Sequence, residues 1–344
     1  MSESFQLPNK RSAYSALRTF FNVHLSPTSK PDECIKLPRI SDTRLAQDSA
    51  TESSESAKDK TVLYLAYGSN LSAETFKGVR GIKPLSAINV HVPSLDLTFD
   101  LPGIPYIEPC FANTRYHTDE PSHGRSTRDY HKDRWHKGLI GVVYEVTPED
   151  YATIIATEGG GASYQDIMVQ CYALPSGIGK VDPIPNGTPF KAHTLLCPAG
   201  EGEGNRFSRP DPSYAQASAR YLKLITDGGE EHSLPDEYMA YLYNIRPYSI
   251  TTVKQKLGKA IFLTFWMPLL IALIGLGKVL ADKDGKIPEW LANLTALLLQ
   301  FLWGSYDLFF KRVFGDGERT IGDDDEDDEG GDTWPEKRIM LSSV

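Results

Sequence analysis

An uncharged run of 18 residues, AIFLTFWMPLLIALIGLG at 260–277, constrains this chain more than any other feature. About 18 or more apolar residues form a helix long enough to cross the hydrocarbon core of a membrane. The run is apolar on all sides, which favours a membrane span over the buried helix of a soluble domain. A second uncharged run, 290–306, is interrupted by Asn293 and Gln300, so we expect a second span or an interfacial helix. We therefore predict one or two membrane helices within residues 258–312.

Positive charge stands on both outer flanks of these runs. The cytosolic flanks of membrane helices carry an excess of Lys and Arg. If both runs cross, the rest of the chain faces the cytosol, and we expect a membrane protein with its globular part on that side. The flanking cations are Lys254, Lys256, Lys259, Lys311 and Arg312.

The charge balance excludes nucleic acid as a general partner. The chain has 344 residues, with 45 acidic and 36 basic ones, and a polyanion binder needs the opposite balance. Part of the acidic excess lies in DDDEDDE at 323–329, so we predict an acidic disordered tail over 313–344. The four cysteines are far apart in the sequence, which indicates a reducing compartment and no disulfide framework.

The remaining chain divides into a polar leader and one globular region. Residues 1–60 read as disordered leader and linker, ending in DSATESSESAKDK. Residues 61–250 alternate short strand-like runs with a few helices at irregular spacing, which predicts an α+β fold with a curved or barrel-like sheet. The polar insertion at 116–137 holds four of the eight histidines, but their spacing fits no metal site, so we expect a mobile surface loop. The strand-like runs are TVLYLA, LDLTFD, GLIGVVYEV, IMVQCYAL and FKAHTLLC.

A carboxyl group stands at an unexpected place in VTPEDYATIIATEGGGASY. Thr147 is a natural N-cap, and the glycines after residue 158 stop the helix. Its apolar stripe is Tyr151, Ile154 and Ile155, and Glu158 continues the same stripe toward the core. Burial and the negative end of the helix dipole would both raise its pKa, as suits a proton carrier near neutral pH. The alternative is a helix-end glutamate that bends into solvent.

Two further segments carry polar groups where apolar ones are expected. In LYLAYGSNLSAETF, a strand ends at Tyr67-Gly68-Ser69-Asn70 before a helix with Ser72 as cap. Such a turn can present backbone N–H groups to an anion, with Gly68 permitting a positive φ or a close approach. The alternative is a plain strand–helix connection. A helix beginning at Asp211-Pro212 and ending at Gly228-Gly229 turns Tyr221 inward, where it is either a substrate contact or a core tyrosine.

Together these segments resemble the γ-glutamylcyclotransferases. YLAYGSNL (64–71), the helix ending at Glu158, and ARYLKLITDGGEEHSLPDEYMAYL (219–242) stand in that family's order, and LTFDLPGIPYIEPCFANTR (97–115) and GLIGVVYEV look like its intervening strands. The resemblance covers roughly residues 61–248. The Y-G-S-N form is most similar to the glutathione-cycle type. The insertion and the C-terminal extension depart from the pattern, and EGGGASY is one residue shorter than usual.

The resemblance implies a small β-barrel with packed helices, no cofactor and no metal. It implies release of 5-oxoproline and a free amine from γ-glutamyl peptides or amino acids. Glu158 would be the general acid and base, and Tyr221 would contact the substrate. The γ-glutamyl group would be held by Tyr64, Leu65, Ala66, Tyr67, Gly68, Ser69 and Asn70.

Three functional hypotheses follow. The first is a membrane-tethered γ-glutamylcyclotransferase whose catalytic domain would work without the C-terminal extension. The second is a tailoring enzyme that removes the γ-glutamyl group from a glutathione adduct in secondary metabolism. The third is a non-catalytic binding domain on a membrane anchor, which the retention of Glu158 and Tyr221 disfavours.

Overall fold

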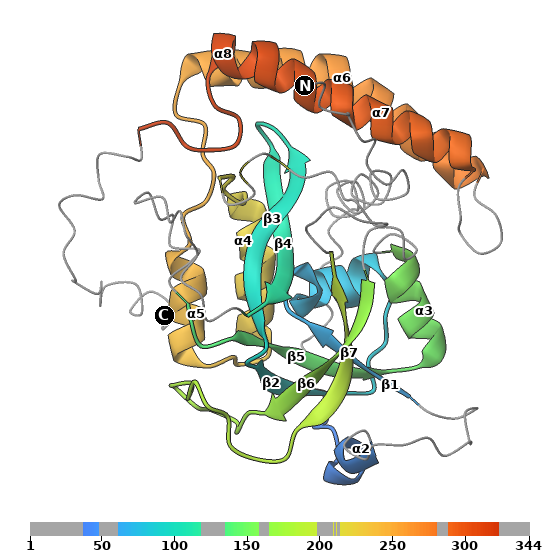
Figure 1. The fold of residues 1–344 in the computed structure, drawn as a ribbon, viewed down its shortest axis with the longest axis vertical. Coiled ribbons are helices and arrows are strands. Elements are labelled where there is room, and N and C mark those ends of the chain that lie inside the picture. Colours follow the sequence, from blue (N-terminus) through green and yellow to red (C-terminus); the bar gives the residue numbers. More distant parts are fainter. Residues whose placement is uncertain are drawn as a thin grey trace, which may run out of the picture.

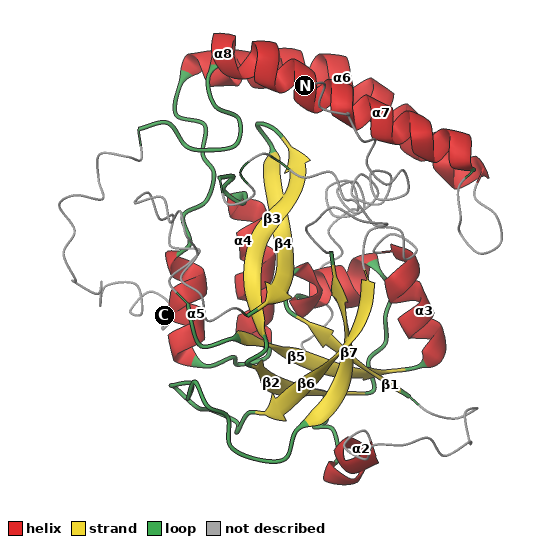
Figure 2. Ribbon diagram, viewed as in Figure 1, coloured by secondary structure: helices red, strands yellow, loops and turns green. Residues whose placement is uncertain are grey.

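A computed structural model describes residues 37–47, 61–117, 135–157, 165–197, 209, 211, 214–280 and 288–322. Its centre is a closed five-stranded barrel in the order β1-β5-β2-β6-β7. Neighbouring strands are antiparallel except β1 and β7, which meet in parallel and close the barrel. The fold is therefore the α+β barrel that the sequence predicts (Figures 1 and 2). The strands are β1 (Val62–Ala66), β2 (Ser86–Val92), β5 (Leu139–Val146), β6 (Gln165–Ala173) and β7 (Phe190–Leu196).

A long two-stranded arm stands apart from the barrel. Strands β3 (Leu95–Ile104) and β4 (Glu108–Tyr116) pair with each other in a separate antiparallel sheet. Figure 1 shows this arm rising from the barrel toward the C-terminal helices. The turn at its tip holds Tyr106, which is 1% exposed. The arm therefore joins the barrel to the C-terminal helices.

All five strand-like runs of the sequence lie on strands, but two predictions need correction. Strand β2 was not among the predicted strands, although Ile88, Val90 and Val92 alternate as a strand requires. The expected disordered leader is also too long. Residues 37–47 pack on the barrel through Ile40, which is 1% exposed, and include helix α2 (Asp42–Gln47). Arg44 donates to the Thr61 carbonyl at 2.6 Å.

Three helices cover the barrel and the arm. They are α3 (Pro148–Thr157), α4 (Ala219–Glu231) and α5 (Asp236–Asn244). Helix α3 begins as predicted, because the Thr147 hydroxyl accepts from the Asp150 N–H at 3.1 Å. Helix α4 differs from the prediction at both ends. Its N-cap is Ser218, whose hydroxyl accepts from the Tyr221 N–H, and it continues through Gly228 and Gly229.

The C-terminal apolar runs form a helical hairpin of α6 (Val253–Leu280) and α7 (Glu289–Ser305). Helix α7 continues into the π-turn η3 (Tyr306–Phe310) and the short α8 (Lys311–Phe314). One described helix, over Val253–Gly277, is long and apolar enough to cross a membrane, and a third of its most apolar window is buried inside the fold. Whether either helix crosses stays a prediction.

The chain after the hairpin returns to the β3–β4 arm and the segment before α4 as a strap, residues 315–322. The Tyr106 N–H donates to the Gly317 carbonyl at 2.8 Å, and the Gln216 N–H donates to the Glu318 carbonyl at 2.8 Å. The buried Gln216 side chain accepts from the Thr320 N–H at 2.7 Å. Residues 313–322 therefore belong to the fold, and the expected tail from 313 begins too early; its acidic run at 323–329 lies outside the described residues.

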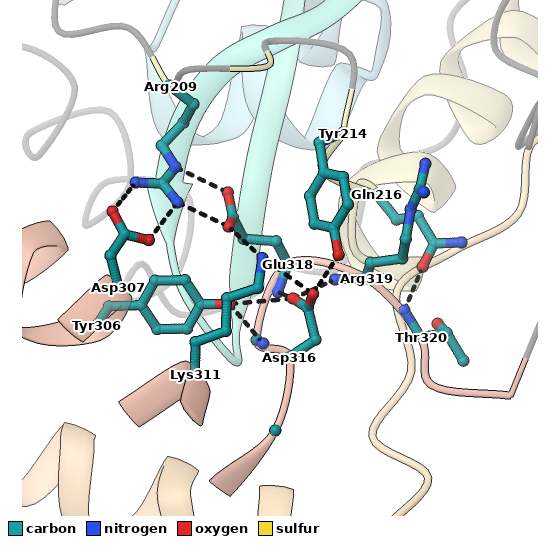
Figure 3. Close-up of polar contacts among 12 residues, drawn as sticks. Arg209, Tyr214, Gln216, Tyr306, Asp307, Lys311, Asp316, Glu318, Arg319 and Thr320 are labelled. Carbon is teal, nitrogen blue, oxygen red and sulfur yellow. Dashed lines mark hydrogen bonds and ion pairs between the residues drawn. The ribbon is translucent and has the colours of Figure 1, made fainter. Parts of the chain in front are cut away.

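A charged cluster joins the strap, the hairpin and the segment before α4 (Figure 3). The Arg209 guanidinium binds both carboxylate oxygens of Asp307, at 2.6 and 2.7 Å, and both of Glu318, at 2.8 and 2.9 Å. It also lies over the Trp303 ring, 4.2 Å from its centre. Glu318 is 1% exposed. A buried carboxylate with a bidentate arginine partner is strongly destabilised if that partner is lost, so the cluster fixes the hairpin against the rest of the molecule.

Candidate active site

The predicted loop at the end of β1 forms a tight elbow. The 3₁₀ turn η1 (Ser69–Leu71) follows directly, with the Leu71 N–H donating to the Gly68 carbonyl at 3.0 Å. The Tyr67 hydroxyl donates to the Leu195 carbonyl at 2.6 Å, which fixes the elbow to β7. Gly68 has a φ of −114°, so the positive φ considered for it is not found. The first N–H groups of such a turn are not used by the turn itself.

Gly68 instead allows the elbow to approach Tyr221 and Ala112 closely. It is half-buried, whereas the residues around it from Tyr64 to Asn70 are buried. A Cβ at this position would lie 3.4 Å from both the Tyr221 hydroxyl and the Ala112 Cβ. The Tyr221 hydroxyl accepts from the Ala112 N–H at 3.1 Å. Three segments far apart in sequence, the elbow, β4 and α4, thus meet at one phenol oxygen.

The predicted substrate-holding residues at the start of this stretch lie inside the framework. Tyr64 is 3% exposed, and its hydroxyl accepts from the Asn70 side-chain amide at 2.9 Å. Leu65 and Ala66 are buried, and the Leu65 carbonyl accepts from the Thr194 hydroxyl at 3.0 Å. In the structure these residues form part of β1, the strand that leads into the elbow, and their contact with a substrate stays a prediction.

The C-terminal half of α4 supports the elbow from the other side. A Cβ on Gly228 would overlap the Leu71 carbonyl carbon and the Ser72 nitrogen, so the two backbones lie against each other. The Glu231 carboxylate accepts from the Ala73 N–H at 2.8 Å, at the start of the π-turn η2 (Glu74–Val79). Burial raises the pKa of Glu231.

A second polar pair completes this support, and sequence reasoning missed it. The Tyr144 hydroxyl contacts His232 Nε2 at 2.7 Å and the Leu71 carbonyl at 3.3 Å. Burial lowers the pKa of His232 to about 4, so the imidazole is neutral at neutral pH. The available signal was Tyr144 itself, since a tyrosine inside the apolar strand VVYEV needs a hydroxyl partner.

Glu158, the predicted acid and base, lies outside the described residues. Helix α3 is described as far as Thr157 and lies beside β1, with the Tyr151 and Tyr64 ring centres 6.3 Å apart. Ile154 is buried, and Tyr151 and Ile155 are partly buried. The stripe on which the prediction places Glu158 therefore faces the barrel, and the position of the carboxyl group itself stays a prediction.

No group of three His, Cys, Asp or Glu side chains within the described ranges could hold a metal ion. The histidine-rich insertion lies mostly outside those ranges, because residues 118–134 are not described. Cys110, Cys171 and Cys197 are buried.

Comparison with known proteins gives matches over most of the chain. The γ-glutamyl cyclotransferase gliK of Aspergillus fumigatus is 34% identical over 258 residues, which are 75% of this chain and 89% of that protein. The γ-glutamyl cyclotransferase aclK of Aspergillus oryzae is 32% identical over 270 residues, 77% of this chain and 92% of that protein. A solved structure named "Gamma-glutamyl cyclotransferase" is 20% identical, with a TM-score of 0.39, and covers 56% of this chain and 92% of that one.

The C-terminal hairpin has a match of its own. A family profile described as the AclK C-terminal domain matches residues 252–313. These bounds enclose α6, α7, η3 and nearly all of α8. The hairpin is therefore a unit that recurs in other proteins and is not peculiar to this chain.

Proposed function

This chain belongs to the γ-glutamyl cyclotransferase family, and from that membership we propose that it converts γ-glutamyl peptides or amino acids into 5-oxoproline and a free amine. The observation that carries this proposal is the meeting of the Tyr67–Asn70 elbow with Tyr221, beside the helix that leads to Glu158. The reaction is an intramolecular aminolysis. The substrate's α-amine attacks the γ-carbonyl of the same glutamyl unit, a C–N bond closes the five-membered ring, and the original amide C–N bond breaks.

Proton transfer balances without another reactant. Glu158 accepts a proton from the attacking amine and returns it to the leaving amine. The carbonyl oxygen gains negative charge as the bond forms, and N–H groups at the start of the elbow would stabilise it. Because nucleophile and electrophile belong to one molecule, the protein mainly selects the cyclising conformation, where intramolecularity already supplies much of the acceleration.

The test of the acid–base role is Glu158→Gln in the full-length protein. The amide cannot accept the proton, so we expect turnover of a γ-glutamyl dipeptide to fall by roughly 10²–10⁴-fold, while substrate binding and thermal unfolding stay the same. The matched control is Glu149→Gln, a change of the same chemistry at an exposed position in the first turn of α3. Release of 5-oxoproline is the measurement. Equal turnover in both variants would remove Glu158 from the mechanism.

The substrate is a separate question with its own assay. The two candidates are a free γ-glutamyl dipeptide and a glutathione S-conjugate, as for a tailoring enzyme acting on glutathione adducts. Comparing kcat/KM for these two compounds on the purified protein separates them. Absence of turnover with every γ-glutamyl compound would instead support a binding domain.

The chain is further proposed to act at a membrane, with the catalytic half in the cytosol. Support comes from the length and apolarity of α6 and from the lysines that precede it.

A further inference from the structure

The hairpin exposes most of the large hydrophobic side chains found on the surface of the described residues. In α6 those between residues 253 and 269 form a row at four-residue spacing, and in α7 they lie on the side opposite the buried one. Phe265 is 60% exposed, Phe301 63% and Trp290 54%. Soluble monomers rarely expose such contiguous apolar surface unless it binds something. The outer face, as we call it, consists of Leu257, Ile261, Phe265 and Leu269 of α6, Trp290, Leu294, Leu297 and Phe301 of α7, and Leu308 of η3.

The opposite side of the hairpin is already occupied. Tyr106 at the tip of the β3–β4 arm packs edge-on against Phe262 of α6, at 5.9 Å, and Tyr306 of η3, at 5.7 Å. Phe262 also packs against Phe310, at 5.0 Å. The hairpin therefore has one face that holds the catalytic half and one face that the described part of the chain leaves uncovered.

This attachment leaves too little helix to span a bilayer. Tyr106 touches α6 at Phe262, and Arg209 lies on Trp303 of α7; a charged cluster at that level cannot stand in hydrocarbon. The helix that remains beyond these contacts is 263–280 in α6 and 289–302 in α7, about 27 Å and 21 Å long at 1.5 Å per residue, against a core of about 30 Å. The hairpin also runs across the end of the molecule, with the arm and barrel along its flank (Figure 1).

The end of the hairpin that meets the catalytic half is basic. The first turns of α6 carry Lys254 and Lys256, both exposed, and Lys259, partly exposed. Arg312 of α8 is exposed nearby, because α8 packs on α6 where Gly258 meets Phe314. Lys311 is paired with Asp316 at 3.1 Å and is not part of this group. Lys and Arg near a membrane surface are each attracted by anionic headgroups with about 1 kcal/mol.

We propose that the outer face of the hairpin lies in the interface of an anionic phospholipid membrane, with both helix axes parallel to the bilayer plane. The apolar rows enter the boundary between headgroups and acyl chains, to a depth of about 5–10 Å for helices of this kind. The exposed cations Lys254, Lys256 and Arg312 meet the headgroups at one end. The inference rests on the membrane part of the proposed function and changes its form from spanning to lying on the surface.

Flotation with sealed vesicles of phosphatidylcholine and phosphatidylserine tests the occupant. The full-length protein should float with them, and Phe265→Asp/Phe301→Asp should lower vesicle affinity by roughly 100-fold, because two apolar groups leave the lipid and two anions enter it. The control is Ile184→Asp, at a residue that is 77% exposed and far from the hairpin in sequence, which should float like the wild type. A wild type that stays unbound but is a dimer, with a monomeric double variant, would assign the face to a second copy and overturn the proposal.

A thiol reporter tests the orientation. Glu289→Cys, exposed at the start of α7, is placed in full-length protein carrying Cys34→Ser; the other three cysteines are buried. On sealed vesicles, a surface helix predicts complete labelling by an impermeant maleimide added outside. Labelling only after detergent would show that the hairpin crosses, and would overturn the proposal. Neither assay needs turnover, so loss of 5-oxoproline release with intact flotation would count against the catalytic proposal alone.

Discussion

Among single residues, Tyr221 has the most consequential contact, because its hydroxyl satisfies the N–H of Ala112, which is 6% exposed. Tyr221→Phe leaves that N–H without its partner in a buried site. We expect the free energy of unfolding in urea to fall by about 1–3 kcal/mol, and kcat/KM to fall because the oxygen beside Gly68 is lost.

The matched control is Tyr243→Phe. Tyr243 is 47% exposed, and its hydroxyl pairs with Glu230 at the surface. Water replaces such a partner, so this variant should unfold like the wild type. Equal urea midpoints for the two variants would mean that the Ala112 N–H finds another acceptor.

His232 predicts a pH dependence of stability. Its pKa is about 4 in the folded protein, through burial, and about 6.5 when unfolded. Between these two pH values the unfolded chain binds more protons than the folded protein. The free energy of unfolding therefore falls as pH drops from 6.5 toward 4, by up to about 3 kcal/mol. Glu231, with its raised pKa, gives a slope of opposite sign above pH 4.5.

The comparison of wild type with His232→Gln isolates the histidine from other groups. Urea unfolding at pH 7 and pH 5 should show a larger loss in the wild type than in the variant. Parallel losses would show that His232 keeps an ordinary pKa in the folded state.

At the scale of elements, the sequence predicts what is local and misses what depends on distant partners. The Thr147 cap and the stripe of α3 are local, and both are confirmed. The predicted start of α4 at Asp211 is wrong, because residues before Ser218 bond to the strap instead of forming a helical turn. The predicted end at Gly228 is also wrong, because this glycine allows contact with η1 and does not terminate the helix. The parallel closure of β1 on β7 has no local signature either.

The packing of α4 on η1 can be tested at Gly228. Gly228→Ala puts a methyl group into the backbone of Leu71 and Ser72, so the helix or the elbow must shift. We expect a loss of about 1–3 kcal/mol in the free energy of unfolding, as for overpacked cores, and lower activity because the elbow moves.

The matched control is Gly275→Ala in α6, where a Cβ meets nothing within 4 Å. There the change should be neutral or stabilising by up to about 1 kcal/mol, because alanine is the better helix former. A Gly228 variant as stable and active as the Gly275 variant would show that α4 and η1 are not in firm contact.

At the scale of the whole molecule, the sequence predicted a separable catalytic domain, and the strap argues against it. The partners of the strap lie far away in the chain, and the sequence of the strap, GDGERTIG, reads as part of a polar tail. A chain ending at Thr252 deprives the Tyr106 and Gln216 N–H groups and the buried Gln216 side chain of their partners. With about 1–3 kcal/mol per buried unpaired group, we expect this chain to unfold at much lower urea concentration and to lose activity.

A chain ending at Gly322 is the control, because it keeps every contact described for the strap while lacking the acidic run. It should match the full-length protein in urea unfolding and in 5-oxoproline release. If the chain ending at Thr252 matched it too, the strap would be dispensable and the domain separable after all.

The strap also sets the moment at which this protein can fold during its synthesis. The Tyr106 hydroxyl donates to the carbonyl of Gly315, 209 residues later in the chain. At roughly 5–20 residues per second of translation, the tyrosine leaves the ribosome about 10–40 s before its partner exists. Throughout that interval the tip of the β3–β4 arm lacks its partners in the strap while the apolar hairpin is being made, so we expect the nascent chain to depend on chaperones until residues 315–322 have been synthesised.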